Sequence, residues 1–127
     1  MDTAFYKEGK RMSYTEVTHM LGHMIEKKII SELDQNTLQN FYLRLFESTY
    51  MKIKEYLETK NYKIVNYRQG LLTATQVKLI AEPEVWYEAL EKKKLIDEGK
   101  EIEDLNHFIT HVYYKQMKQL LDLLDQK

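Results

Sequence analysis

Apolar residues recur every three or four positions along most of this chain, and that helical spacing constrains its fold more than any other feature. The spacing is most regular from Glu101 to Leu124, where apolar and aromatic residues keep one stripe in register for about six turns. The 127 residues include only four glycines and one proline, so few positions can interrupt a helix. The sequence therefore predicts an all-α protein.

Local patterns divide this periodicity into separate helices. Ser13-Tyr14-Thr15-Glu16 has the form of a capping box, which predicts a helix from Ser13 to about Ile30. A second helix is expected from about Asn36 to Lys60, ended by Asn61, a residue type that tolerates a left-handed backbone.

Two further helices are expected before the last one. Thr73 or Thr75 can cap a short helix that ends at Ala81. Pro83 suits the first position of the next helix, where its missing N–H does no harm. Helices joined by short connections predict an antiparallel four-helix bundle with one additional short helix.

Composition excludes several classes of protein. The absence of cysteine excludes disulfides, thiolate metal sites and cysteine nucleophiles. Nineteen Lys and Arg residues against twenty Asp and Glu give a net charge of −1, which argues against a general nucleic-acid binder. No apolar run approaches the roughly 18 residues of a membrane span, so we expect no membrane segment and a cytoplasmic location. No linker divides the chain, so residues 1–127 should form one helical domain, with residues 1–12 as a loose N-terminal arm.

The four histidines form two pairs, His19 with His23 and His107 with His111, each spaced four residues apart. Two histidines at this spacing on a helix can chelate one metal ion. Helical geometry places both pairs opposite the apolar stripes, so their side chains should point away from the core. We therefore predict no metal site and no cofactor, and a metal-binding helical bundle, with the ion held between chains, is an alternative.

Catalytic motifs are absent from the sequence. Ser13, Ser31 and Ser48 lie outside any Gly-x-Ser-x-Gly turn, and there is no glycine-rich phosphate loop. The basic run Lys92-Lys93-Lys94 closes a predicted helix among acidic residues, which is typical of compensation of the helix dipole. We predict that the protein is not an enzyme and has no catalytic or cofactor-binding residues.

The second helix has a wide apolar surface, extending over more than a third of its circumference. Such a helix is central in its own domain or packs against another chain. Aromatic residues add candidate contacts for a partner protein: Tyr50, Trp86, Tyr87 and Tyr114. Together these features predict a non-catalytic helical interaction module that binds a protein partner, forms a homo-oligomer, or does both.

Several short stretches resemble the substrate-binding subunits of minimal nucleotidyltransferases, a family of HEPN-like helical partner proteins. They are Phe46–Leu57, Leu79-Ile80, Glu84-Val85-Trp86, Leu90, Ile109 and Tyr113-Tyr114. The resemblance implies a helical bundle that is the partner subunit of a nucleotidyltransferase-like enzyme. Lys93-Lys94 replaces the family's Arg-Asn pair and no histidine follows in 95–99, so no ribonuclease residue is carried over.

Nucleic-acid binding is a second alternative. The segment from Tyr14 to Gly22 superficially resembles the first helix of a helix-turn-helix, which would indicate a small regulator of phage or plasmid type. A polar recognition helix does not follow it cleanly, and the neutral charge balance argues against this function.

Overall fold

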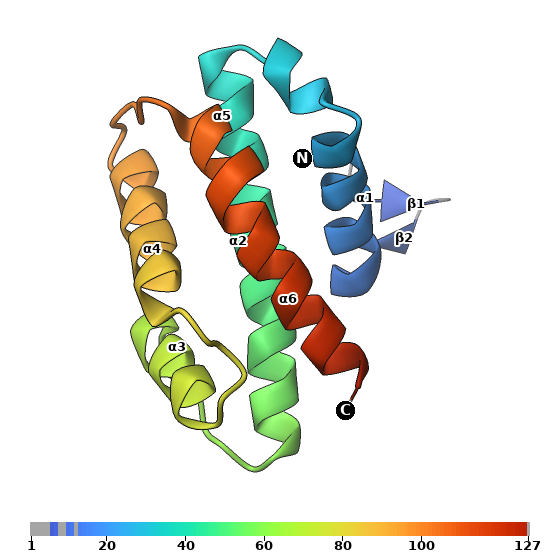
Figure 1. Cartoon of the computed structure of the whole chain (residues 1–127), viewed down its shortest axis with the longest axis vertical. Coiled ribbons are helices and arrows are strands. Elements are labelled where there is room, and N and C mark those ends of the chain that lie inside the picture. Colours follow the sequence, from blue (N-terminus) through green and yellow to red (C-terminus); the bar gives the residue numbers. More distant parts are fainter. Residues whose placement is uncertain (1–5, 8–9, 12, 127) are drawn as a thin grey trace.

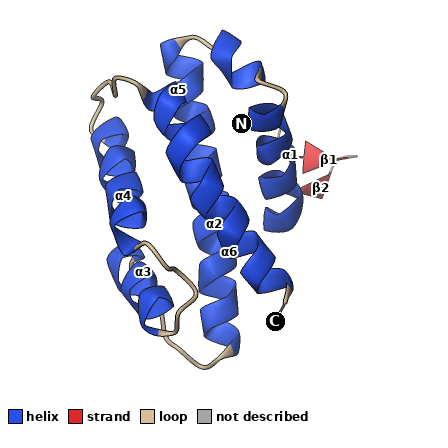
Figure 2. Ribbon diagram, in the orientation of Figure 1, coloured by secondary structure: helices blue, strands red, loops and turns tan. Residues whose placement is uncertain are grey.

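The computed structural model describes residues 6–7, 10–11 and 13–126, and most of them are helical (Figures 1 and 2). The helices are α1 (Tyr14–Glu26), the 3₁₀ turn η2 (Ile29–Glu32), α2 (Gln35–Thr59), α3 (Tyr67–Gln76), α4 (Pro83–Asp97), α5 (Leu105–Phe108), the π-helical turn η3 (Ile109–Tyr113) and α6 (Tyr114–Asp125). Two-residue strands, β1 (Tyr6–Lys7) and β2 (Lys10–Arg11), pair antiparallel ahead of α1. The predicted all-α class is confirmed, while most of the predicted N-terminal arm lies outside the described residues.

Several helix ends lie where the sequence placed them. The Ser13 hydroxyl accepts from the Glu16 N–H at 3.1 Å, and the Glu16 carboxylate accepts from the Ser13 N–H at 3.2 Å, so the capping box is formed. Asn61 follows α2 with a φ of 70°, in the left-handed region. Pro83 is the first residue of α4. These ends were predictable because each depends on residues within one turn of the chain.

Several predicted boundaries in the first half of the chain and before α4 are wrong. The first helix ends at Glu26 rather than near Ile30, because Lys28 adopts a left-handed φ of 60° and η2 follows. The helix predicted from Thr73 or Thr75 to Ala81 begins earlier, at Tyr67, where the Asn66 side chain accepts from the Gln69 N–H at 2.8 Å. It also ends earlier, at Gln76, and Lys78 then adopts a left-handed φ of 64°.

The last helix also differs from the prediction. It begins at Leu105, after Asp104 with a φ of 57°, and not at Glu101. The π-helical turn η3 interrupts this helix, yet most of the predicted stripe is buried, including Ile109, Tyr113 and Met117, while Val112 is only partly covered. The more specific prediction is an antiparallel four-helix bundle with one additional short helix. It is unconfirmed, because the last helix is interrupted and α3 begins earlier than predicted.

Helix α2 is central, and its own chain covers its wide apolar surface. It packs against α1, α3, α4 and α5 (Figure 1). None of the large apolar side chains found exposed in the described residues belongs to α2; they are Ile29, Tyr62, Val65 and Leu72. The alternative in which α2 packs against another chain is therefore not needed to explain its composition.

Aromatic rings join α2 to α4 and to the last helix. Trp86 of α4 meets Tyr113 edge to face at a centroid distance of 5.3 Å, and Tyr113 also contacts Tyr42 and Phe46 of α2. The Tyr42 hydroxyl donates to the Ala89 carbonyl at 2.6 Å. This core holds the last helix in place along α2. In the described residues, no helix combines the length and apolarity needed to cross a membrane.

Candidate functional site

Two of the four aromatic residues predicted as partner contacts lie in the core. Trp86 is 1% exposed and Tyr50 is 4% exposed. The Tyr50 hydroxyl donates to the Asn66 carbonyl at 3.0 Å, and its ring lies 4.6 Å from that of Tyr67. Their assignment as interaction residues is therefore wrong, because Tyr67 of α3 packs against Tyr50 and Tyr113 of the last helix packs against Trp86 within the same chain.

The other two aromatic candidates remain partly accessible. The Arg68 guanidinium lies 5.1 Å from the centre of the Tyr87 ring, which is partly buried. Tyr114 is also partly buried, at the contact between α1 and α6. Its side chain lines a pocket between these two helices.

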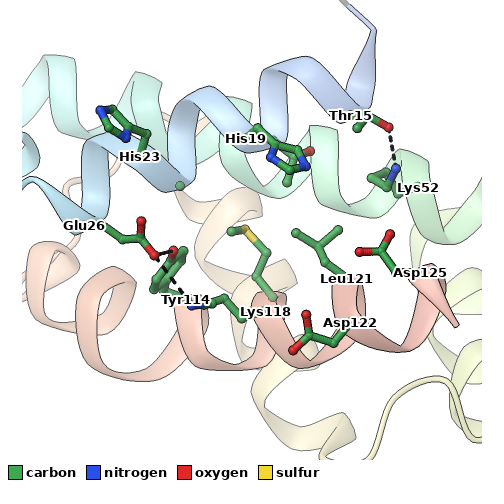
Figure 3. A pocket seen from close by; sticks show the side chains of 13 residues that line it. Thr15, His19, His23, Glu26, Lys52, Tyr114, Lys118, Leu121, Asp122 and Asp125 are labelled. Carbon is green, nitrogen blue, oxygen red and sulfur yellow. Dashed lines mark hydrogen bonds and ion pairs between the residues drawn. The ribbon is translucent and has the colours of Figure 1, made fainter.

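This pocket has a volume of about 340 Å³ and lies between α1 and α6; we call it the α1–α6 pocket (Figure 3). The two helices come close at Gly22, where a Cβ would lie 3.4 Å from the Tyr114 ring. Met117 and Leu121 of α6 supply the apolar part of its lining. The two helices are therefore close at this position, where a Cβ would make ordinary van der Waals contact.

Charged groups near Tyr114 are paired within the chain. The Tyr114 hydroxyl donates to the Glu26 carboxylate at 2.6 Å, and the Lys118 ammonium lies 3.6 Å from the same carboxylate. The hydrogen bond from Tyr114, with the charge of Lys118, lowers the pKa of Glu26. Burial, followed by the bond to Glu26, raises the pKa of Tyr114. This end of the α1–α6 pocket is held by a tyrosine, a carboxylate and a lysine.

The other end of the pocket carries unpaired acidic groups. Asp122 and Asp125 of α6 line it and form no ion pair or hydrogen bond with any described residue (Figure 3). The Lys52 ammonium, which also lines the pocket, donates to the Thr15 hydroxyl at 2.6 Å. Two carboxylates beside apolar side chains therefore remain available to a ligand.

All four histidines are exposed, in the direction that helical geometry predicted. His19 and His23 line the α1–α6 pocket. His107 and His111 line a second pocket, and their ring centroids are 4.6 Å apart. Within the described parts of the chain, no group of three or more His, Cys, Asp or Glu side chains could hold a metal ion. The sequence indicated which way these side chains point, but not that each pair borders a concave surface.

The basic run at the end of α4 has partners within the chain. The Lys92 ammonium lies 4.7 Å from the centre of the Phe108 ring. Lys93 forms an ion pair with Asp97 at 2.7 Å and lies 4.9 Å from the centre of the Tyr67 ring. These two side chains cover aromatic rings of the same chain, and the compensation of the helix dipole predicted for the run stays a prediction.

Comparison with known proteins finds no match, either among family models or among curated sequences. The resemblance to the partner subunits of nucleotidyltransferases therefore stays a prediction.

Proposed function

We propose that this protein is a non-catalytic helical interaction module that binds a partner protein at the α1–α6 pocket. The observation that supports this function best is the pairing of apolar lining with unpaired carboxylates: Asp122 and Asp125 lie beside Leu121 and Met117. Pockets between helices commonly receive apolar side chains of a partner segment, and charges at the rim select its orientation.

The charges define the chemistry of the partner segment. A segment that places an apolar side chain against Leu121 and lysine or arginine beside Asp122 and Asp125 would complement the pocket. The same carboxylates would repel the phosphates of a nucleic acid, which favours a protein partner over the nucleic-acid alternative. The resemblance to nucleotidyltransferase partner subunits suggests a nucleotidyltransferase-like enzyme as the protein that carries the segment.

The test joins partner capture to chemical mapping. The full chain is used to capture its partner from the native host, and a carbodiimide then links carboxylates to lysines in direct contact. We expect links from Asp122 or Asp125 to partner lysines, and loss of capture in the double variant Asp122→Asn/Asp125→Asn. The matched control is Glu101→Gln/Glu103→Gln, which removes the same charge at exposed positions outside the pocket.

Three results would contradict this function. The first is equal capture by the Asp122→Asn/Asp125→Asn chain and the wild type, and the second is a set of cross-links confined to other surfaces. The third is a shift of duplex DNA in a low-salt gel that is lost steeply as salt rises, which would favour a regulator of nucleic acid. A link to a second copy of the chain would instead assign the pocket to self-association.

A further inference from the structure

A second pocket, of about 380 Å³, lies between the turn that follows α1 and the beginning of the last helix; we call it the η2 pocket. Ile25 and Ile30, which are 3% and 1% exposed, give it an apolar wall. Its volume falls in the lower part of the range of small-molecule sites. This pocket is separate from the α1–α6 pocket, with which it shares no lining residue.

The polar lining of the η2 pocket contains cationic and hydrogen-bonding groups and no carboxylate. Lys28, His107 and His111 contribute an ammonium and two imidazoles. Lys28 has no ion-pair partner among the described residues. The Asn106 side-chain oxygen accepts from the Thr110 hydroxyl at 3.1 Å, which leaves the Asn106 amide N–H groups free to donate. The open polar groups of this pocket therefore suit an anion.

The neighbouring imidazoles can be interpreted in two ways. A ring separation of 4.6 Å is compatible with two ligands of one metal ion. However, the Lys28 ammonium lines the same pocket and would repel a cation, and no third His, Cys, Asp or Glu among the described residues joins the pair. An anion would instead attract the Lys28 ammonium and accept hydrogen bonds from the N–H groups of both rings. The lining as a whole therefore favours an anion over a metal ion.

The backbone of the last helix shapes the same pocket. Thr110 and His111 belong to η3, the π-helical turn, and π-turns within α-helices recur at functional sites. The wider turn places these side chains opposite the α1–η2 turn, which presents Lys28.

We propose that the η2 pocket binds a small organic anion, in which a carboxylate or phosphate is attached to a compact apolar body. The anionic group would contact Lys28, His107 and His111, and the apolar body would lie against Ile25 and Ile30. The volume of the pocket exceeds that of the anionic group alone, which is why an apolar body is included. This inference is independent of the partner protein proposed for the α1–α6 pocket.

The first experiment compares ligands of the same shape and different charge. Benzoate, neutral benzamide, phenyl phosphate and inorganic phosphate are titrated into the full chain and followed by two-dimensional NMR. We expect benzoate or phenyl phosphate to shift the resonances of Lys28, Asn106 and His107, with benzamide binding about tenfold more weakly or worse. Phenyl phosphate should bind more tightly than inorganic phosphate because it also fills the apolar part of the pocket.

The second experiment removes the ammonium and the two imidazoles in separate variants. Lys28→Gly deletes the ammonium and suits the left-handed backbone at this position, so the fold should be retained. Lys28→Gly and the double variant His107→Gln/His111→Gln should each weaken the anion about tenfold. The control is His19→Gln/His23→Gln, the matched change in the α1–α6 pocket, which should leave the affinity of the η2 pocket for the anion unchanged.

Several results would overturn the proposal. Equal affinity for benzoate and benzamide would show that charge is not recognised, and equal affinity for phenyl phosphate and inorganic phosphate would show that the apolar body is not. Resonance shifts that map to α6, or no binding of any of the four compounds at millimolar concentration, would also contradict it. Binding of Zn²⁺ that needs His107 and His111 and is unaffected by Lys28→Gly would assign the pocket to a metal instead. A folded Lys28→Gly chain with undiminished anion affinity would likewise contradict it.

Discussion

Two tyrosines in the central aromatic cluster differ in whether the hydroxyl has a partner. Tyr42 donates to the Ala89 carbonyl at 2.6 Å. The Tyr113 hydroxyl is buried and forms no hydrogen bond of ordinary geometry with a described residue; the nearby Thr49 side chain lowers its pKa, but by less than burial raises it. Burial raises the pKa of both phenols, because the charged phenolate is poorly solvated in the core. The same residue type therefore has a stabilising hydroxyl at one position and a costly one at the other.

We predict opposite effects for the two Tyr→Phe substitutions. Tyr113→Phe removes a buried hydroxyl that forms no hydrogen bond of ordinary geometry, and it should leave the free energy of unfolding unchanged or raise it by up to about 1 kcal/mol. Tyr42→Phe removes a buried hydrogen bond and should lower it by about 1 kcal/mol. Urea unfolding of both variants measures the difference, and a loss for Tyr113→Phe as large as that for Tyr42→Phe would show that its hydroxyl is hydrogen-bonded.

At the scale of the elements, two helical glycines should respond differently to substitution. A Cβ at Gly70 of α3 would lie 2.5 Å from the Tyr50 hydroxyl and 2.9 Å from its ring. The Tyr50 ring packs against Phe46 and Tyr67 and its hydroxyl donates to the Asn66 carbonyl, so a shift of the ring would disturb these contacts. Gly70→Ala should therefore lower the free energy of unfolding by about 1–3 kcal/mol, as measured by chemical denaturation.

Gly22→Ala in α1 is the matched control for Gly70→Ala. Its Cβ would meet the Tyr114 ring at 3.4 Å, and alanine favours the helix by up to about 1 kcal/mol. The free energy of unfolding of Gly22→Ala should therefore differ from that of the wild type by less than about 1 kcal/mol. Equal losses for the two variants would show that contact with Tyr50 does not explain the glycine at position 70.

The cap of α2 should make stability depend on pH in the acidic range. Asp34 accepts from the Thr37 N–H at 2.8 Å, and this bond lowers the pKa of its carboxyl below the ordinary 3.8. The folded state therefore binds the proton less readily than the unfolded chain. The stabilisation by Asp34 is complete above the unfolded pKa and is lost as the pH falls through the lower folded value.

Asp34→Asn tests this dependence because asparagine caps helices but does not titrate. Thermal unfolding between pH 6 and 2.5 should show a smaller decrease in Tm for the variant than for the wild type. Parallel curves for the two chains would mean that the charge of Asp34 does not contribute.

At the scale of the whole molecule, the tyrosines should make the fold sensitive to alkali. Burial raises the pKa of Tyr50 to about 12, against an ordinary value of 10, and raises that of Tyr67 and Tyr113 further. Above pH 10 the unfolded chain loses protons that the folded chain keeps, so stability should fall as the pH rises from about 10 to 12. Thermal unfolding across this range, with tyrosinate absorbance recorded in parallel, measures the effect.

Tyr50→Phe provides the control for the alkaline effect, because it removes one of these groups. Its Tm should fall less steeply with pH than that of the wild type. Ionisation of all ten tyrosines near pH 10 without unfolding would contradict this prediction.

Features that depend only on neighbouring residues could be predicted without the structure. The all-α class, the capping box at Ser13, the left-handed Asn61 and the outward histidines all follow from interactions or directions within one or two helical turns. They could be predicted because helical geometry fixes which neighbours in the sequence share a face or an end.

Which helix surfaces are covered and which remain open depends on packing between segments that are distant in the sequence. Trp86 and Tyr50 are buried by segments distant in sequence, and the α1–α6 pocket is closed at one end by a bond between Glu26 and Tyr114, 88 positions apart. The η2 pocket likewise depends on a left-handed turn at Lys28 meeting a π-helical turn. Such contacts depend on how whole helices pack, and local periodicity does not specify that packing.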